Sequence, residues 1–416
     1  MLRLICAAQE DVLRQVYLDN NATTALHTEV VEAMLPCLRD EFGNPSSVHW
    51  AGRQANELLQ QARAQVASAL NAEPHEIVFT SCGSEGDNMA ILGSADALRT
   101  KGNHIITSTV EHPAVLDTCR YFEQRGGRVT YVAVDREGRI DPAEVEAAIE
   151  ADTVLISLMW ANNETGTVFP IEQLAAIARK HEVRFHTDAV QALGRLPIDV
   201  KQLPVDLLTI SAHKIGGPKG VGALYVRDGV EISPLIHGGH QEKHLRAGTH
   251  NVAGIVGFGR ACQWVEEHLS SESKRLTRLR NRLEEGIYAQ VEHVSRNGDR
   301  KNCLPNTLNL AFPYVEGEGL LLALDMVGIA ASSGSACTSG AAGASHVLKA
   351  MNADDMTLNS SVRLSLGFNT TEEDVEYVIQ HLPRVVGRLF SMSLAFDELS
   401  QYDCDVISCE IDPHAH

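Results

Sequence analysis

Short apolar runs alternate with amphipathic segments through the first two thirds of the chain. Apolar runs of this length are typical of buried strands, and apolar residues at helical spacing predict helices. Strands are predicted at 76–80, 104–108, 129–134, 153–159, 183–187, 207–211 and 223–226. Helices are predicted between them, for example at 56–70, 142–151 and 171–181. Strands that alternate with helices indicate an α/β fold, with a mostly parallel seven-stranded sheet covered by helices on both faces.

The last third of the chain has a different pattern. A long helix is predicted at 253–291, and it is followed by strand-like runs at 307–312, 329–332 and 361–366, mixed with helices. This pattern indicates a second, smaller α+β domain. We expect a large domain at 25–270, a small domain made of 1–24 with 271–395, and an acidic tail at 396–416 that is mobile.

Composition narrows the class of protein. The 416 residues are 44% hydrophobic and 21% charged, which is typical of a globular protein of enzyme size. A net charge of −19 repels phosphate backbones and argues against nucleic-acid binding. Nine scattered cysteines without a CxxC pair argue against a disulfide framework and a zinc ribbon, and favour a reducing cytoplasm. No apolar run is long enough to predict a membrane span.

The segment 211–222 is the most informative for chemistry. A predicted strand ends at Ser211, and a loop rich in glycine follows it with two lysines, Lys214 and Lys219. Ligand sites form at such strand ends, and a lysine there can hold pyridoxal phosphate (PLP) as a Schiff base. Lys214 is preferred because it directly follows the strand. The alternative is that this segment is an ordinary glycine-rich turn.

A second strand end carries Asp188, followed three residues later by Gln191. A carboxylate at this place can pair with the ring nitrogen of PLP and keep it protonated, and Gln191 can bond the phenolic oxygen. The alternative for Asp188 is a helix N-cap. Because Lys214 follows the end of another predicted strand, the cofactor interpretation is favoured.

Two further segments fit the same cofactor. In 77–88 a strand, a turn of small residues and a helical run follow one another, so Gly83 and Ser84 can bind a phosphate at the helix N-terminus. In 110–115, His112 can stack on a ring and move protons. An ordinary turn and a structural histidine are the alternatives.

Taken together, these segments resemble the cysteine desulfurases, PLP enzymes of fold type I in the class V aminotransferase superfamily. The resemblance covers about 17–383 and is closest to the NifS branch, which serves iron–sulfur assembly. It rests on these motifs in order: YLDNNATT (17–24), FGNPSS (42–47), EHPAV (111–115), ANNETG (161–166), HTDAVQ (186–191), SAHK (211–214), GGHQE (238–242), RAGT (246–249) and SSGSACTSG (332–340).

The resemblance implies a role for each matching residue. Lys214 would carry the cofactor, Asp188 and Gln191 would contact its ring, and His112 would stack on it. The phosphate would be held by Gly83, Ser84, Ser211 and His213. Thr249 would reach the phosphate of the other subunit's cofactor, which implies a homodimer.

For the substrate, the resemblance implies that Asn163 and Arg363 hold the carboxylate of L-cysteine. In 362–366 the arginine alternates with apolar residues, so it can face a polar site while the other face packs. Cys337, among small residues, would attack the substrate sulfur and carry it as a persulfide, leaving alanine. An iron–sulfur scaffold protein would accept the sulfur, and Cys337 would contact a cluster only transiently.

The chain departs from the family pattern in two places. Residues 340–346 lack the Leu-Glu-Pro that usually follows the cysteine, and Gly86 stands where serine is usual. The histidines at 237, 240, 244 and 250 match no zinc-site spacing, so no metal is expected at the PLP site. Transamination, selenocysteine cleavage and a catalytically idle fold are the rival functions. The intact Lys214 and Cys337 favour desulfuration.

Overall fold

The computed structural model describes residues 14–333 and 345–408, and side chains only as far as residue 392. Its centre is one seven-stranded sheet with the strand order β2-β8-β7-β6-β5-β3-β4. All neighbouring strands are parallel except β8, which is antiparallel to both β2 and β7. The strands are β2 (Ile77–Thr80), β3 (His104–Ser108), β4 (Arg128–Val132), β5 (Thr153–Ser157), β6 (Arg184–Asp188), β7 (Leu207–Ser211) and β8 (Gly222–Val226). The predicted α/β fold with a mostly parallel sheet is confirmed.

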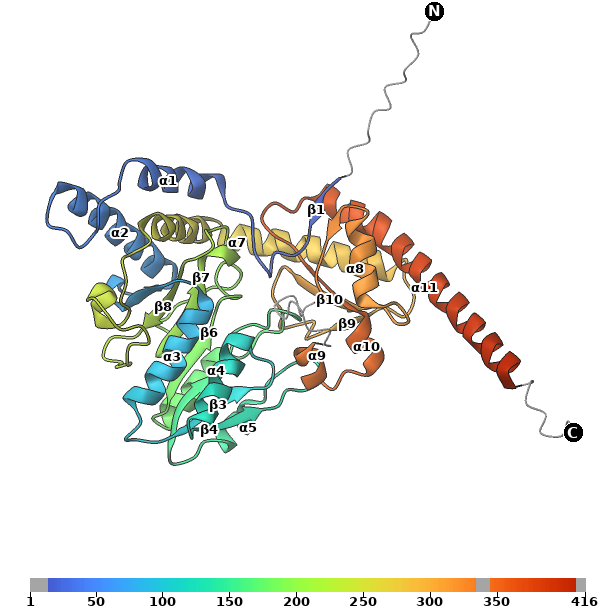
Figure 1. Cartoon of the computed structure of the whole chain (residues 1–416), viewed down its shortest axis with the longest axis horizontal. Coiled ribbons are helices and arrows are strands. Elements are labelled where there is room, and N and C mark those ends of the chain that lie inside the picture. The colour runs from blue at the N-terminus through green and yellow to red at the C-terminus, as the bar shows by residue number, and fades with distance from the viewer. Residues whose placement is uncertain (1–13, 334–344, 409–416) are drawn as a thin grey trace, which may run out of the picture.

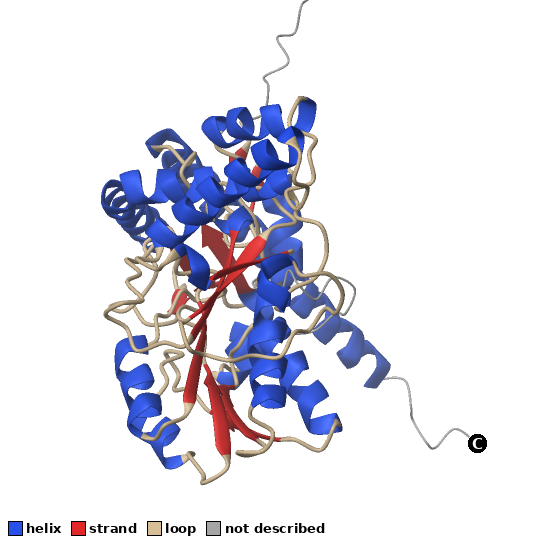
Figure 2. Ribbon diagram, turned by 90° about the vertical axis from the view of Figure 1, so that its left-hand side faces the viewer, coloured by secondary structure: helices blue, strands red, loops and turns tan. Residues whose placement is uncertain are grey.

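Helices cover both faces of this sheet (Figures 1 and 2). On one face, α3 (Gly83–Ala97) and α4 (Pro113–Gln124) pack with alternate residues of the strands, such as Ile105 and Leu207. On the other face lie α2 (Trp50–Ala69), α5 (Pro142–Ala147), α6 (Ile171–Lys180) and the first half of α7 (Val252–Tyr288). Because apolar side chains point to both faces, the strands appear in the sequence as continuous apolar runs.

A second cluster of buried apolar side chains lies apart from the large sheet. It is built on a small antiparallel sheet of the order β12-β10-β9 and on a parallel pair of β1 with β11. The second half of α7 packs into it, so this single helix spans both clusters. The elements are β1 (Val16–Tyr17), β9 (Ser295–Asn297), β10 (Thr307–Ala311), α8 (Gly317–Asp325), β11 (Ile329–Ala330), β12 (Ser361–Ser365) and α11 (Glu372–Ser408).

The remaining elements are short or lie on the periphery. They are α1 (Thr28–Arg39), η1 (Pro74–Glu76), η2 (Ala212–Lys214), η3 (Gln241–His244), α9 (His346–Ala350) and α10 (Asp355–Ser360). The segment 397–408, which has a weak pattern in the sequence, continues α11 in this structure. Within the described ranges, no helix combines the length and the apolar character that crossing a membrane requires.

Close packing of α3 on the sheet explains the unusual glycine at position 86. A Cβ at Gly86 would come within 2.7 Å of Cγ2 of Thr209 on β7, which is too close for van der Waals contact. Gly86 is also buried. The helix therefore lies nearer to the sheet than a larger side chain would allow.

We predict that Gly86→Ala lowers the free energy of unfolding by about 1–3 kcal/mol, because overpacking forces the helix or Thr209 to shift. Gly387→Ala is the matched control. Gly387 lies in α11, and nothing described comes within 4 Å of a Cβ there, so the change is expected to be neutral or stabilising by up to about 1 kcal/mol. Urea unfolding of both variants checks this. Equal stability of the two would contradict the packing argument.

Candidate active site

A cavity of about 260 Å³ lies at the carboxyl ends of β6 and β7, beside the N-termini of α3 and α4. Ligand sites of open α/β sheets form at this edge. The cavity brings together ten of the residues named from the sequence: Gly83, Ser84, His112, Asn163, Asp188, Gln191, Ser211, His213, Lys214 and Arg363. Thr249 is exposed and does not line it. Cys337 lies outside the described residues.

Lys214 ends the turn η2, which follows β7 directly. Its Nζ donates hydrogen bonds to the carbonyl oxygens of Asn21 at 2.6 Å and Ala22 at 2.8 Å, so the amine is fixed at the wall of the cavity. Lys219, the competing lysine, is exposed and does not line the cavity. The structure therefore favours Lys214 over Lys219 as the amine that reaches a ligand.

Asp188 ends β6, is buried and lines the same cavity as this lysine. Burial raises the pKa of Asp188 to about 6, although a hydrogen bond from the Val190 backbone N–H at 2.9 Å and the charge of Lys214 oppose the rise. A cationic ring nitrogen in the cavity would stabilise the ionised carboxylate. The site is therefore suited to a protonated pyridine ring.

Gln191 is held from two sides. Its Oε1 accepts a hydrogen bond from Nη1 of Arg195 at 2.9 Å, and its Nε2 donates to the carbonyl oxygen of Asn21 at 3.0 Å. These contacts direct the amide nitrogen toward Asn21, which itself lines the cavity. A second N–H of that nitrogen remains for an oxygen on a ligand ring.

The residues expected at the phosphate form a cradle for an anion. Gly83 and Ser84 are the first residues of α3, where backbone N–H groups are free of helical partners. The hydroxyl oxygen of Ser211 is buried, and no partner for it occurs in the described structure. Burial, with the charge of Lys214, lowers the pKa of His213 to about 4, so its ring is neutral near pH 7. A buried hydroxyl without a hydrogen-bond partner, next to a helix N-terminus, is suited to binding a phosphate.

His112 is the N-cap of α4 and also lines the cavity. Its Nδ1 accepts a hydrogen bond from the Ala114 backbone N–H at 3.1 Å, so the neutral ring carries its proton on Nε2. Burial, with the charge of Lys214, lowers the pKa of His112 to about 4. His112 thus has the structural role of a helix cap and also presents its ring to the cavity, while its stacking on a cofactor ring remains a prediction.

Arg363 reaches the cavity from β12 and is only 2% exposed. Its Nη2 donates to Oδ1 of Asp19 at 2.7 Å and its Nη1 to the carbonyl oxygen of Asn163 at 3.0 Å. Its Nε is buried and has no partner among the described residues. Val362 and Leu364 beside it belong to the second apolar cluster, as the alternation in the sequence predicts. The guanidinium therefore still has N–H groups that can donate to the carboxylate of a ligand.

Asp87 and Asn21 are cavity residues to which the sequence analysis gave no role. Asp87 is 1% exposed, and its Oδ1 has no hydrogen-bond partner in the described structure. Burial, with the charge of Asp188, raises the pKa of Asp87 well above its usual range. The sequence contains one signal for Asp87: it follows Gly83 by four residues, so the two share a helix face and Asp87 could be predicted to face the same site. Asn21 lies in the quoted segment 17–24, but its backbone role is invisible in sequence.

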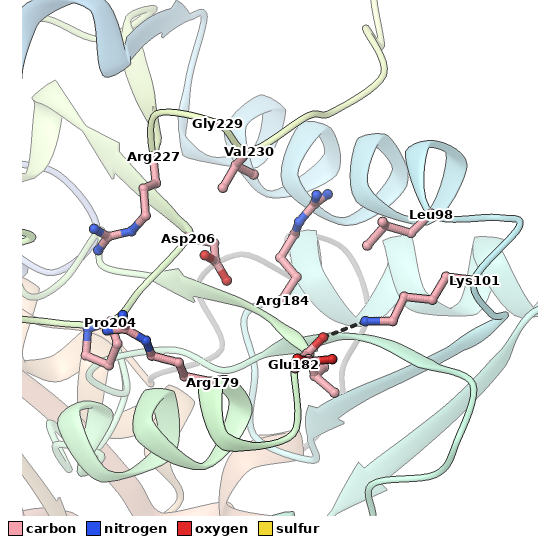
Figure 3. Close-up of a pocket in the computed structure, with 11 residues that line it drawn as sticks. Leu98, Lys101, Arg179, Glu182, Arg184, Pro204, Asp206, Arg227, Gly229 and Val230 are labelled. Atoms are coloured by element: carbon pink, nitrogen blue, oxygen red, sulfur yellow. Dashed lines mark hydrogen bonds between the residues drawn. The ribbon is translucent and has the colours of Figure 1, made fainter.

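A larger cavity of about 400 Å³ opens at the opposite edge of the sheet, where β6 and β7 begin (Figure 3). Its wall includes Arg184, Asp206 and Lys101, and Nζ of Lys101 donates to the Glu182 carbonyl oxygen. The wall contains no cysteine, serine, threonine or histidine, and none of the residues expected at a cofactor. Size alone therefore does not mark the catalytic cavity.

The histidines at 237–250 do not gather around one point. His240 and His244 contact each other, with 2.8 Å between their Nδ1 atoms, whereas His250 contacts Glu242. In the part of the chain that the structure describes, no three His, Cys, Asp or Glu side chains form a group suited to a metal ion.

Comparison with known proteins agrees with this geometry. The family described as aminotransferase class-V matches residues 16–378. A cysteine desulfurase IscS of Dictyoglomus turgidum is 50% identical over 380 residues, covering 91% of this chain and 96% of the relative. A cysteine desulfurase of Trichormus azollae is 51% identical over 378 residues, covering 91% and 94%. A solved NifS-like protein superimposes with a TM-score of 0.86 at 40% identity, covering 90% of this chain and 100% of that one.

The chain therefore belongs to the class-V aminotransferase family, whose enzymes depend on PLP. Its curated relatives at about 50% sequence identity are cysteine desulfurases. This confirms the predicted desulfurase activity, in preference to transamination or selenocysteine cleavage. The cavity fits the cofactor, because an amine, a buried carboxyl and an anion cradle with an orphaned hydroxyl meet in it.

Glu111, beside His112, should make stability depend on pH. Burial, with the charge of Asp188, raises the pKa of Glu111 to about 8, while hydrogen bonds from Ser108 and the Met159 N–H oppose the rise. The folded state thus keeps a proton that the unfolded state releases above about pH 4.5. The stabilisation is complete below that pH and is lost as the pH rises to 8, by at most about 1.4 kcal/mol per pH unit.

We predict that Glu111→Gln flattens this dependence between pH 5 and 8, because glutamine mimics the protonated acid and cannot ionise. The exposed Glu57→Gln is the control and should leave the slope unchanged. Urea unfolding of the two holoenzyme variants at several pH values measures the difference. Identical slopes for Glu111→Gln and the unaltered protein would refute the assignment.

Proposed function

We propose that the chain removes sulfur from L-cysteine at the cavity around Lys214, giving L-alanine and a persulfide on Cys337. The observation that carries this proposal is the meeting of Lys214, Asp188 and Arg363 in one cavity. Bound PLP supplies the electron sink that makes the Cα proton of the substrate acidic. The residues of the chain bind the reactants and move the protons.

Lys214 would hold the cofactor through its amine, and that amine would be free for proton transfer once the substrate is bound. Asp188 would pair with the ring nitrogen, Gln191 would bond the ring oxygen, and His112 would stack on the ring. Gly83, Ser84, Ser211 and His213, which line the same cavity, would hold the phosphate. Because the backbone carbonyls of Asn21 and Ala22 accept from Nζ of Lys214, they can hold the freed amine close to the reacting carbon.

Arg363 and Asn163 bind the substrate carboxylate. The fork of the guanidinium matches a carboxylate with two parallel hydrogen bonds, and the Asp19 and Asn163 contacts fix its orientation. With the carboxylate held there, the freed Nζ of Lys214 takes the Cα proton. His112 assists later proton transfers through Nε2.

The thiolate of Cys337 attacks the sulfur of the bound cysteine. A sulfur–sulfur bond forms while the carbon–sulfur bond breaks. The electron pair of the broken bond stays on Cβ, which takes up a proton with the help of His112 and becomes the methyl group of alanine. The flanks of 334–344 support this role. Ser332 pairs with the backbone of Arg363, and Ser345 donates to Glu164, so this segment begins and ends near the cavity.

The same proposal includes a homodimer. Large exposed apolar side chains lie on α1, on the segment after it and at the start of α2: Leu35, Leu38, Phe42, Val48 and Trp50. Such an exposed patch is typical of an interface. It lies beside the loop of Thr249, because Pro45 and Ser46 share a surface cavity with Glu242 and His250. Thr249 then reaches the cofactor phosphate of the partner subunit.

We also propose the domain bounds, the sulfur acceptor and the cellular compartment of the enzyme. The large domain is 25–270, the small domain combines 1–24 with 271–395, and the boundary crosses α7. The sulfur acceptor is an iron–sulfur scaffold protein, and the compartment is the cytoplasm. Free cysteines at 37, 82, 119, 262 and 303 fit a reducing environment.

We predict that Cys337→Ala lowers alanine formation from cysteine by at least about 10²-fold and leaves the visible absorbance of bound PLP intact, because only the sulfur acceptor is lost. Lys214→Ala should instead remove that absorbance. Cys37→Ala, at a half-buried thiol outside the cavity, is the control and should keep full activity. Persistent production of alanine and sulfide by Cys337→Ala would overturn the mechanism.

Arg363→Lys should raise the KM for cysteine by roughly 10–10²-fold, because an ammonium cannot form the two parallel bonds of a guanidinium. The exposed Arg388→Lys is the matched control and should leave KM unchanged. Steady-state kinetics with PLP-saturated enzyme measures both. An unchanged KM in Arg363→Lys would show that the carboxylate binds elsewhere.

A further inference from the structure

The loop 237–250 contains an unusual backbone. Glu242, Lys243 and His244 are consecutive, none of them is glycine, and their φ angles are 43°, 55° and 69°. Side chains disfavour this left-handed region, and such strain persists only where the surroundings enforce it. Contacts of the loop must therefore hold these three residues in place.

Glu242 supplies the strongest of these contacts. Its side chain is only 2% exposed, and its carboxylate pairs with Nη2 and Nη1 of Arg63 at 2.6 and 2.8 Å. It also accepts from the backbone N–H of Phe79 at 3.0 Å and from Nε2 of His250 at 2.7 Å. These partners more than offset burial and lower the pKa of Glu242 to about 2. The strained residue is thus anchored to α2 and β2.

A second ion pair ties the same loop to Glu85 in the first turn of α3. Nε of Arg246 donates to Oε1 of Glu85 at 2.8 Å, and Oε2 of Glu85 accepts from the Ser81 backbone N–H at 2.8 Å. Gly248 N–H donates to Oε1 of Gln241 at 3.1 Å. Thr249 lies between two tethered residues, Gly248 and His250, yet it is itself exposed. These contacts hold the loop, and Thr249 does not line the cavity of its own chain.

We infer that Glu242 is a positioning residue that acts on the partner subunit's site: it holds the strained loop so that Thr249 reaches the partner's cofactor phosphate. This inference rests on the proposed homodimer and on the proposed role of Thr249. A purely structural anchor would stabilise its own chain only. The two accounts differ in which of the two sites of a dimer loses its cofactor when Glu242 is changed.

Mixed dimers separate these accounts. Two chains with different affinity tags are co-expressed, and the heterodimer is purified; Lys214→Ala disables one of its two sites. In the first dimer, a Lys214→Ala chain is paired with a Glu242→Gln chain, so the intact site receives an unaltered loop. In the second, a Lys214→Ala/Glu242→Gln chain is paired with an unaltered chain, so the intact site receives the altered loop. The dissociation constant of PLP is measured by absorbance.

We expect the first dimer to bind PLP like a heterodimer that carries only Lys214→Ala. The second should bind PLP roughly tenfold or more weakly, since a hydrogen bond to a charged phosphate is lost. Glu57→Gln, the same exchange at an exposed position of α2 outside the loop, is the matched control and should change neither dimer. Weaker binding in the first dimer but not the second would overturn the inference, as would equal binding in both.

Thr249→Ala in the same two arrangements separately tests the proposed role of Thr249 at the partner's site. If it weakens PLP binding in the second arrangement and Glu242→Gln does not, the role of Thr249 stands and the inference fails. If Thr249→Ala has no effect across the dimer, or the purified protein is monomeric, the proposed function itself fails at this point. Should Glu242→Gln chains not fold, Arg246→Gln breaks only the second tie and must show the same pattern across the dimer.

Discussion

The burial of Asp188 beside Lys214 is the constraint on which the rest of the site depends. A carboxyl that is fully buried at a strand end is costly to ionise, and here one backbone N–H and one amine compensate it only in part, since its pKa stays at about 6. A cofactor ring with a cationic nitrogen would complete this compensation. The proposed pairing of Asp188 with the ring nitrogen would then favour both the binding of the cofactor and its orientation.

The sheet brings these two groups together, and the N-terminal segment keeps them there. Strands β6 and β7 are parallel neighbours, so Asp188 and Lys214 emerge at the same edge. The carbonyl oxygen of Asn21 accepts from both Lys214 and Gln191, and the side chain of Asn21 contacts Asn163 and Thr307. Asn21 thereby links the amine of Lys214 to β10, the strand that pairs with β12 and its Arg363.

Much of this could be predicted from the sequence, because local patterns report burial and strand ends. Strands β3 and β7 have the predicted bounds, and the residues that end β6 and β7 define the cavity. Tertiary contacts carry no such local signal. The backbone carbonyl of Asn21 and the buried Asp87 were missed for that reason, and the strain at Glu242 follows from distant partners on α2 and β2. The role of Cys337 rests on family resemblance, since this residue lies outside the described structure.

The central claim is that Lys214, and not the nearby Lys219, holds the cofactor. Reduction of the PLP-loaded enzyme with borohydride fixes the cofactor covalently to the lysine that carries it, and peptide mass spectrometry then locates the added mass. The account predicts a pyridoxyl group on Lys214 alone. Modification of Lys219, or loss of the cofactor after reduction and unfolding, would contradict it.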